Sequence, residues 1–441
     1  MLSTNITVSE QQDRFLPICI ASAACVLAYM VAPMMAPGLV PAAALALAIW
    51  LSANAGRVPV LKPSALLLLL GLAGTYLLIN ASWSLAPSSA YASVALYFAL
   101  VVTCFLTIDA LYASSLGVLR VLALGICIGV ACGAMFLLFE VLSNQAVHRL
   151  LMSQVPMLRT NAPEAQSEAG WVTFLPQYIL NRSATAVSLC LWPTLLMIGQ
   201  IEAERWKKVL LYAGVAAGVL AIMGSDHETS KLACLGGALT YIVFLVSPVS
   251  ARRLTIAGWI VATLLVVPLS SLAYSQEVYR AWWLPDMARH RIVIWGYTTE
   301  QLAHAPVFGV GIATPRVLNE RTRDTSEPAP GSHYRRSTKA HSHNIYLQTW
   351  FETGAVGAGM LLVLGLLVLR SLQAAAAGAR PYLHAAFVTS ALVGASSFSL
   401  WAPWFMASFA LAIILSSVGA ALAGLGDRPQ AAPSKRLGLA I

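Results

Sequence analysis

The chain has 441 residues, of which 58% are hydrophobic and only 10% are charged. An ordinary soluble domain carries about 25% charged residues, so this composition excludes a soluble fold with a polar surface. The formal net charge is +9, from 27 Lys and Arg against 18 Asp and Glu. The apolar excess must therefore face lipid.

The apolar residues fall into twelve blocks, most of them close to the 20 or so residues that an α-helix needs to cross a bilayer. Unpaired backbone groups are very costly in hydrocarbon, and the blocks lack the alternation of barrel strands, so each is predicted to be a helix. The first block lacks a convincing signal-peptide cleavage site and is expected to remain as a helix. The blocks cover residues 16–35, 39–54, 63–85, 89–112, 116–142, 183–202, 208–224, 231–249, 254–274, 345–370, 382–402 and 404–424.

The basic residues of the short loops predict the orientation of these helices. Cytoplasmic loops carry an excess of Lys and Arg. With twelve helices both termini are then cytoplasmic, and the two long connections face outward. The short outer loops contain only Lys231, whereas the inner loops and the tail contain Arg57, Lys62, Arg205, Lys207, Lys208, Arg252, Arg253, Arg370, Arg380, Arg428, Lys435 and Arg436.

This topology predicts four parts of the chain. Residues 1–274 hold helices 1–9 and include an outer loop at 143–182. Residues 275–344 form a long outer loop, residues 345–424 hold helices 10–12, and residues 425–441 form a cytoplasmic tail. The expected fold class is an all-α integral membrane protein.

The long outer loop carries a net charge of +3, from nine basic and six acidic residues. Long loops are translocated largely regardless of charge, so this excess could belong to a solvated loop or one that touches anionic lipid. It could also bind an anionic substrate. Outside the cytoplasm nucleotides are not dependably supplied, so a membrane enzyme there would need an activated group delivered on a lipid. A polyprenyl diphosphate would fit, and its oxygens suit guanidinium groups.

Three segments of this loop are predicted from local pattern. A helix follows Pro285, with an apolar face that includes Trp295 and lies at the membrane surface. A glycine-rich turn follows at residues 305–316, where Gly309 and Gly311 allow close approach of the backbone. The polar, proline-containing stretch at 321–340 is expected to be mobile.

The segment after this stretch contains the main candidate for chemistry. His343 precedes a membrane helix and could accept a proton near neutral pH, although capping or packing is an equally good interpretation of its spacing. If the helix starts near His343, Gly354 lies about 20° away around it and Glu352 about 180° away, so Glu352 is not an expected partner. The pair His341 and His343 lacks further ligands nearby, so no metal site is predicted. The cluster at residues 226–228 is interpreted as a plain loop.

Three motifs of this region resemble the O-antigen ligase and polymerase superfamily. His343-Asn344, nine residues, Gly354, two residues and Gly357 is similar to the ligase signature. Residues 291–295, from Arg291 to Trp295, are similar to its Arg-x-x-Ile-Trp element, and residues 308–311 to its Gly-x-Gly turn.

The resemblance implies a glycosyltransferase of GT-C-like architecture in the bacterial inner membrane, with about twelve transmembrane helices and short helices in a long periplasmic loop. It would transfer O-antigen polysaccharide from undecaprenyl diphosphate to a lipid A-core sugar, with inversion and without metal or cofactor. His343 would be the general base, and Arg291, helped by Arg182, Lys231 and Arg289, would neutralise the diphosphate. Relatives often have Ser-Arg where this chain has Ser230-Lys231, and lysine offers only a point charge. The supporting residues would be Asn344, Gly354, Gly309, Gly311 and Trp295.

Three alternatives stay open, none of which involves nucleic acid. An O-antigen polymerase and a protein O-oligosaccharyltransferase would use the same donor with another acceptor. A transporter for a lipid-linked sugar would instead be expected to place ionisable residues and broken helices near the bilayer midplane.

Overall fold

The computed structural model describes residues 8–155, 157–158, 164–322 and 325–426, and the side chains from residue 15 onward within these ranges. Each of the twelve apolar blocks contains a helix, so the all-α membrane fold is confirmed. Most of the predicted tail, residues 427–441, lies outside the described residues. Within the described part, nine helical segments are long and apolar enough to cross a membrane: η1 and α2 (Pro33–Asn54), α3 and η2 (Ala65–Trp83), α4 (Pro87–Tyr112), α5 (Leu116–Leu142), η4 and α7 (Gln177–Gln200), α8 (Arg205–Gly224), α9 (Glu228–Val246), α14 (Ile345–Leu372) and α16 (Pro403–Gly426).

The other three blocks depart from a simple spanning helix. The ninth is bent by 62° between α10 (Pro248–Leu264) and α11 (Val266–Ser275). Pro268 explains this bend, because a proline ring clashes with the carbonyl four residues earlier, here that of Leu264. Helix α15 (Arg380–Ala395) has 16 residues, and the apolar part of α1 (Val8–Val31) is also short. Counting the bent pair, ten spans meet the length and composition criteria in the described ranges.

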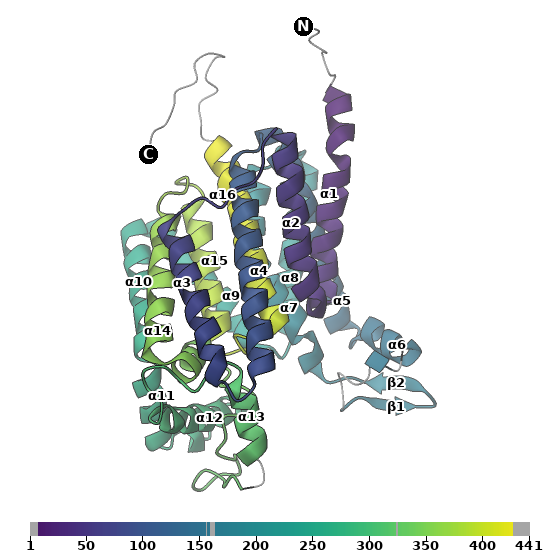
Figure 1. The fold of residues 1–441 in the computed structure, drawn as a ribbon. Coiled ribbons are helices and arrows are strands. Elements are labelled where there is room, and N and C mark those ends of the chain that lie inside the picture. The colour runs from purple at the N-terminus through teal and green to yellow at the C-terminus, as the bar shows by residue number, and fades with distance from the viewer. Residues whose placement is uncertain (1–7, 156, 159–163, 323–324, 427–441) are drawn as a thin grey trace.

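Helix α7 lies at the centre of the bundle. It packs against α5, α8, α15 and α16. Hydroxyl side chains at Thr185, Ser188 and Thr194 are fully buried on it, and each donates to the carbonyl four residues earlier, so burial leaves no donor unpaired. The start of α1 and the end of α16 lie at one end of the bundle, and both long connections lie at the other (Figure 1).

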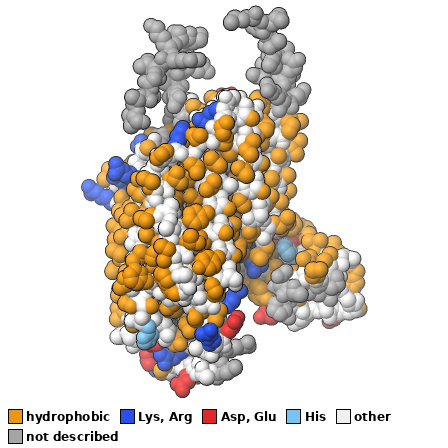
Figure 2. All heavy atoms as spheres, viewed as in Figure 1, with side chains coloured by type: hydrophobic (Ala, Val, Ile, Leu, Met, Phe, Trp, Pro, Cys, Tyr) orange, Lys and Arg blue, Asp and Glu red, His pale blue; other side chains and the backbone are white. Residues whose placement is uncertain are grey.

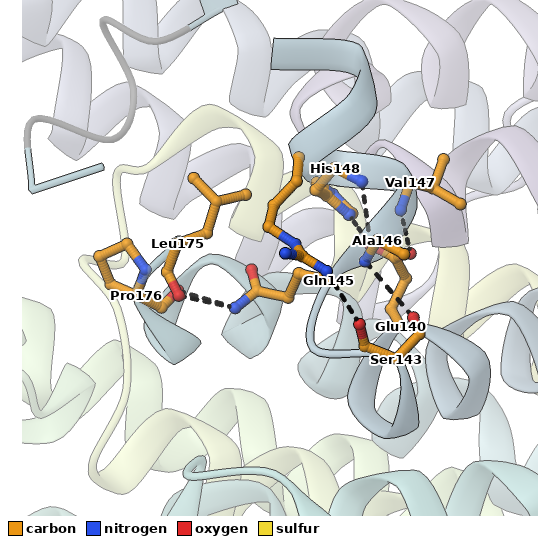
Figure 3. Close-up of polar contacts among 9 residues, drawn as sticks. Glu140, Ser143, Gln145, Ala146, Val147, His148, Leu175 and Pro176 are labelled. Atoms are coloured by element: carbon orange, nitrogen blue, oxygen red, sulfur yellow. Dashed lines mark hydrogen bonds and ion pairs between the residues drawn. The ribbon is translucent and has the colours of Figure 1, made fainter. Parts of the chain in front are cut away.

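The first long connection forms a small lobe beside the bundle. It contains α6 (Ala146–Gln154) and a hairpin of β1 (Gln166–Glu168) and β2 (Trp171–Phe174). Figure 3 shows how the buried Glu140, near the end of α5, holds this lobe: its carboxylate accepts the backbone N–H groups of Val147 (2.9 Å) and His148 (3.2 Å) and contacts the His148 ring. These bonds satisfy the free N–H groups at the start of α6.

The side chain of Gln145 ties the far end of the same lobe. Its amide donates to the carbonyls of Leu175 (3.1 Å) and Pro176 (3.3 Å). Helix α7 starts five residues later, at Asn181. The lobe therefore fixes the place where the chain enters α7, which carries Arg182.

The second long connection is mostly folded. It contains η5 (Val278–Arg280), α12 (Asp286–Leu302) and α13 (Thr314–Thr322). The helix expected after Pro285 is α12. Within the stretch expected to be mobile, Pro328 and Arg335 form an isolated bridge, while residues 323–324 lie outside the described residues.

Candidate active site

The candidate base lies just before α14. The helix begins at Ile345, and its N-cap is Asn344, whose side-chain oxygen accepts the N–H groups of Tyr346 (3.0 Å) and Leu347 (3.2 Å). His343 itself has a left-handed φ of 56° and lies outside the helix. The projection that placed Gly354 about 20° from His343 is therefore wrong, because it assumed one regular helix. Capping is performed by Asn344, which leaves the His343 ring available for another role.

One hydrogen bond determines the tautomer of His343. Its Nδ1 lies 2.9 Å from the carbonyl oxygen of Ser397. A carbonyl can only accept, so Nδ1 carries the proton and Nε2 keeps a lone pair. The pKa of His343 is lowered to about 4, chiefly by burial and to a smaller extent by the positive charge of Arg291, while the hydrogen bond to Ser397 opposes this shift. The imidazole is therefore neutral at pH 7, which is the form that a general base requires.

Arg291, on α12, lies beside the same segment. Its Nη1 donates to the hydroxyl of Ser396 (2.8 Å), the residue next to the partner of His343. Its Nε is buried without a partner, and none of the ion pairs of the described residues includes Arg291. Burial also lowers the pKa of this guanidinium. A partly buried cation without a counter-ion is costly, and an anionic ligand would relieve that cost.

Residues 396–402, here the 396–402 connection, join α15 to α16 and hold these two side chains in place. The backbone carbonyl of Ser396 accepts the hydroxyl of Thr229 on α9 (2.7 Å). On the other side, the amide of Gln348 on α14 donates to Ser399 Oγ (2.9 Å) and its oxygen accepts the N–H of Leu400 (2.9 Å). The connection is thus bonded to α9, α12 and α14 together.

The predicted block at 382–402 is wrong in this region, because α15 ends at Ala395. The residues that follow are rich in serine, whose hydroxyl competes with the helix for backbone groups. Pro403 then starts α16 and disfavours the helical conformation in the residue before it. Both signals are present in the sequence, but the apolar residues on either side of them led to the prediction of one continuous helix.

Helix α14 is broken at Gly354, whose φ of 65° and ψ of −165° are not helical. The backbone of residues 306–311 fills the break, so the groups exposed by it remain paired. A Cβ at Gly309 would lie 2.3 Å from the Glu352 carbonyl, and one at Gly311 would lie 2.6 Å from Ser84 Cα. The turn therefore needs Gly309 to approach α14 and Gly311 to approach Ser84. The bonds run from Val310 N–H to Phe351 O (3.0 Å), Gly311 N–H to Glu352 O (3.0 Å), Ala355 N–H to Pro306 O (2.9 Å) and Val356 N–H to Val307 O (3.2 Å).

Glu352 is fully buried and joins three segments. Its carboxylate accepts hydrogen bonds from Gln348 (2.6 Å), the Trp401 indole (2.6 Å) and the backbone N–H of Ala313 (2.7 Å). None of these three bonds involves His343. Glu352 connects α14 to the 396–402 connection and to the start of α13, which makes it a positioning residue that the sequence did not reveal.

The remaining predicted residues fall into two groups. Trp295 donates to the carbonyl of Ser342 (2.8 Å) and so supports the histidine segment. Arg182, like Arg291, has a buried Nε without a partner and no ion pair among the described residues, and it lies 5.9 Å from the Trp404 ring. Lys231 and Arg289 are already paired, Lys231 with Glu228 (2.8 Å) and Arg289 with Asp286 (3.4 Å). Arg289 also points away from Arg291, because two residues of a helix span about 200°.

His227 corrects the interpretation of residues 226–228 as a plain loop. Its side chain is only 6% exposed, its Nδ1 lies 2.7 Å from Ser230 Oγ, and its ring packs on Phe398 of the 396–402 connection. Burial lowers the pKa of His227 to about 4, with a smaller contribution from Arg291. The position of His227 follows from the packing of α9 against α15, which the local sequence pattern did not show.

A comparison with known protein families matches the part of the chain that contains His343 and Arg291. Residues 213–362 match the family model described as O-antigen ligase, and this segment includes Arg291, the 306–311 turn, His343 and Gly354. The resemblance to the O-antigen ligase family is confirmed.

Two curated proteins are similar to the chain. One is named "Putative polysaccharide ligase" in Rickettsia conorii, with 20% identity over 241 residues. Another of the same description in Rickettsia bellii is 22% identical over 248 residues. Each alignment covers 54% of this chain and 57% of the relative, so the similarity extends over just over half of each protein.

Proposed function

We propose that this O-antigen ligase-like chain transfers O-antigen polysaccharide from undecaprenyl diphosphate to a sugar hydroxyl of lipid A-core. The family match and the names of the two relatives support transfer of a polysaccharide. The long apolar helices support a membrane location, which we take to be the bacterial inner membrane. The basic residues of the short loops support an orientation with both termini cytoplasmic, and the site would then lie at the periplasmic face.

The observation that carries the proposal is that a neutral imidazole and a guanidinium without a carboxylate partner are held by adjacent residues of the 396–402 connection. His343 contacts Ser397, and Arg291 contacts Ser396. Glycosyl transfer with a diphosphate leaving group needs both groups: a base for the acceptor and a cation for the departing negative charge.

The reaction would proceed by direct displacement. His343 Nε2 takes the proton of the acceptor hydroxyl, and the oxygen attacks the anomeric carbon of the donor. The new C–O bond forms as the bond to the diphosphate oxygen breaks, which inverts the anomeric configuration. Arg291 pairs with the departing diphosphate, and Arg182 is the next candidate because its guanidinium is also free of carboxylates. Lys231 and Arg289 would first have to leave Glu228 and Asp286.

The alternatives differ in what happens to the donor. A polymerase or a protein O-oligosaccharyltransferase would break the same bond and use a lipid-linked glycan or a protein hydroxyl as acceptor. A transporter for a lipid-linked sugar would leave the glycosidic bond intact. Broken helices occur in transporters, but the break at Gly354 is filled by residues 306–311 of the same chain, and this favours a fixed site.

The test is a transfer assay with the purified full chain in detergent, supplied with an undecaprenyl-diphosphate glycan and lipid A-core in the presence of EDTA. Product is scored by gel mobility. We expect His343→Ala to lower the rate by a factor of about 10² to 10⁴, the usual contribution of a general base. His304→Ala is the matched control, because His304 is an exposed histidine of the same loop and should keep the wild-type rate.

Each outcome decides something different. Wild-type activity in a folded His343→Ala protein would reject His343 as the base. No product from the wild type with an intact donor would reject the lipid A-core acceptor, and lipid-linked glycan and peptide acceptors would then identify the enzyme class.

A further inference from the structure

A second basic site lies at the end of the bundle opposite His343. A cavity of about 570 Å³ opens there between the end of α9, the start of α10 and the connection from α14 to α15. This volume lies within the range of small-molecule sites, roughly 300–1,000 Å³. Figure 2 shows Lys and Arg side chains at both ends of the molecule; on the face drawn, those at this end have no Asp or Glu beside them, whereas those at the end with the long connections do. The site is therefore separate from the candidate active site.

Three arginines line this cavity: Arg252 and Arg253 from α10, and Arg380 from the first turn of α15. No carboxylate lines it, and none of the ion pairs found in the described ranges includes these three residues. Arg380 donates through Nε to the carbonyl of Ala375 (2.9 Å), which directs its guanidinium while leaving both Nη groups for a ligand. The cavity thus concentrates positive charge without an internal counter-ion.

The helix ends add to this charge. Helices α10 and α15 both begin at the cavity, and neither has an acidic residue in its first turn. The start of a helix carries a partial positive charge, so an arginine there is unfavourable and an anion is favourable. Two helix starts and three guanidinium groups therefore all favour the same ligand, a phosphate-like anion.

The rest of the lining indicates what the anion is attached to. Phe244, Val249 and Ile256 border the arginines, and Val249 is 60% exposed on the surface of the bundle. An apolar wall beside a phosphate-binding group suits an acyl lipid whose headgroup carries the phosphate. We propose that this cavity binds the phosphate of an anionic phospholipid, and this proposal does not depend on the transferase function.

The experiment measures lipid binding to the delipidated full chain in neutral detergent by native mass spectrometry. Phosphatidylglycerol, phosphatidylcholine and inorganic phosphate are titrated separately. The test variant is Arg252→Gln, Arg253→Gln and Arg380→Gln combined. Arg205→Gln is the matched control, because Arg205 is exposed at the start of α8 and lies outside the cavity lining. Size-exclusion elution and helical circular dichroism confirm that each variant is folded.

We expect the wild type and Arg205→Gln to bind phosphatidylglycerol in preference to phosphatidylcholine. One basic residue near an anionic lipid contributes about fivefold in affinity, so the triple variant should bind roughly 100-fold more weakly. Equal binding of phosphatidylglycerol by a folded triple variant would overturn the proposal. Binding of inorganic phosphate but not phosphatidylglycerol would reject the lipid and identify a free anion as the ligand.

Discussion

Replacing Gly354 with alanine should destabilise the protein by roughly 3 kcal/mol. The conformation of Gly354 is one that essentially only glycine adopts, and it costs another residue about 1–3 kcal/mol. A Cβ there would also lie 2.2 Å from the backbone oxygen of Val307. A backbone atom cannot move aside as the end of a flexible side chain can. If the break is kept, strain and overlap therefore add to each other.

The helix could instead straighten, but this route is no easier. The carbonyls of Phe351 and Glu352 would regain helical partners. Four backbone groups of residues 306–311, two N–H groups and two carbonyls, now bond to the break and would lose their partners. At about 1 kcal/mol for each lost hydrogen bond, the cost is about 4 kcal/mol, offset by about 1 kcal/mol from the helix propensity of alanine. Both routes lead to a similar loss.

The measurement is thermal unfolding of the purified protein in one detergent, followed by tryptophan fluorescence. Gly359→Ala is the control, because Gly359 lies on the same helix and a Cβ there meets nothing within 4 Å. We expect Gly354→Ala to unfold several degrees below the wild type and Gly359→Ala to match or exceed it. Equal midpoints for both variants would refute the broken helix.

Three further results are expected of the candidate site. The rate should stay high down to about pH 5 and fall as His343 is protonated near its lowered pKa of about 4, since burial disfavours the charged ring; an acid limb centred near 6.5 would contradict this. Arg291→Lys should lower the transfer rate at least tenfold by removing the guanidinium fork, whereas Arg289→Lys should not; equal rates for the two variants at saturating donor would remove Arg291 from diphosphate binding. Asn344→Ala should lose the N-cap and about 1 kcal/mol of stability, measured by thermal unfolding, and an unchanged midpoint would show that the cap is dispensable.

Hydropathy was sufficient to locate the helices, because a bilayer requires long apolar segments with internally paired backbone. It was insufficient where a helix changes direction inside an apolar run. Pro268 was a readable signal for the bend between α10 and α11. The break at Gly354 was not readable, because it depends on residues 306–311, which are distant in sequence.

The same limit applies to the candidate site. His343 and Arg291 could be selected from local motifs, and so could Trp295. The partners of His343 and Arg291 on the 396–402 connection could not, because Ser396 and Ser397 contribute a hydroxyl and a backbone carbonyl that any short polar segment would offer. Only the tertiary fold shows which segment faces the two side chains.

The shared support of His343 and Arg291 limits how the protein can be re-engineered. A chimera that exchanges residues 396–402 alone would disturb the base and the guanidinium together, and it would also remove the partners of Gln348. A graft intended to change the acceptor should therefore carry the whole of α14 with the connection. An exchange within the lobe at 143–176 would leave the bonds of His343 and Arg291 intact, but it should keep Gln145, which fixes the entry into α7 and so the position of Arg182.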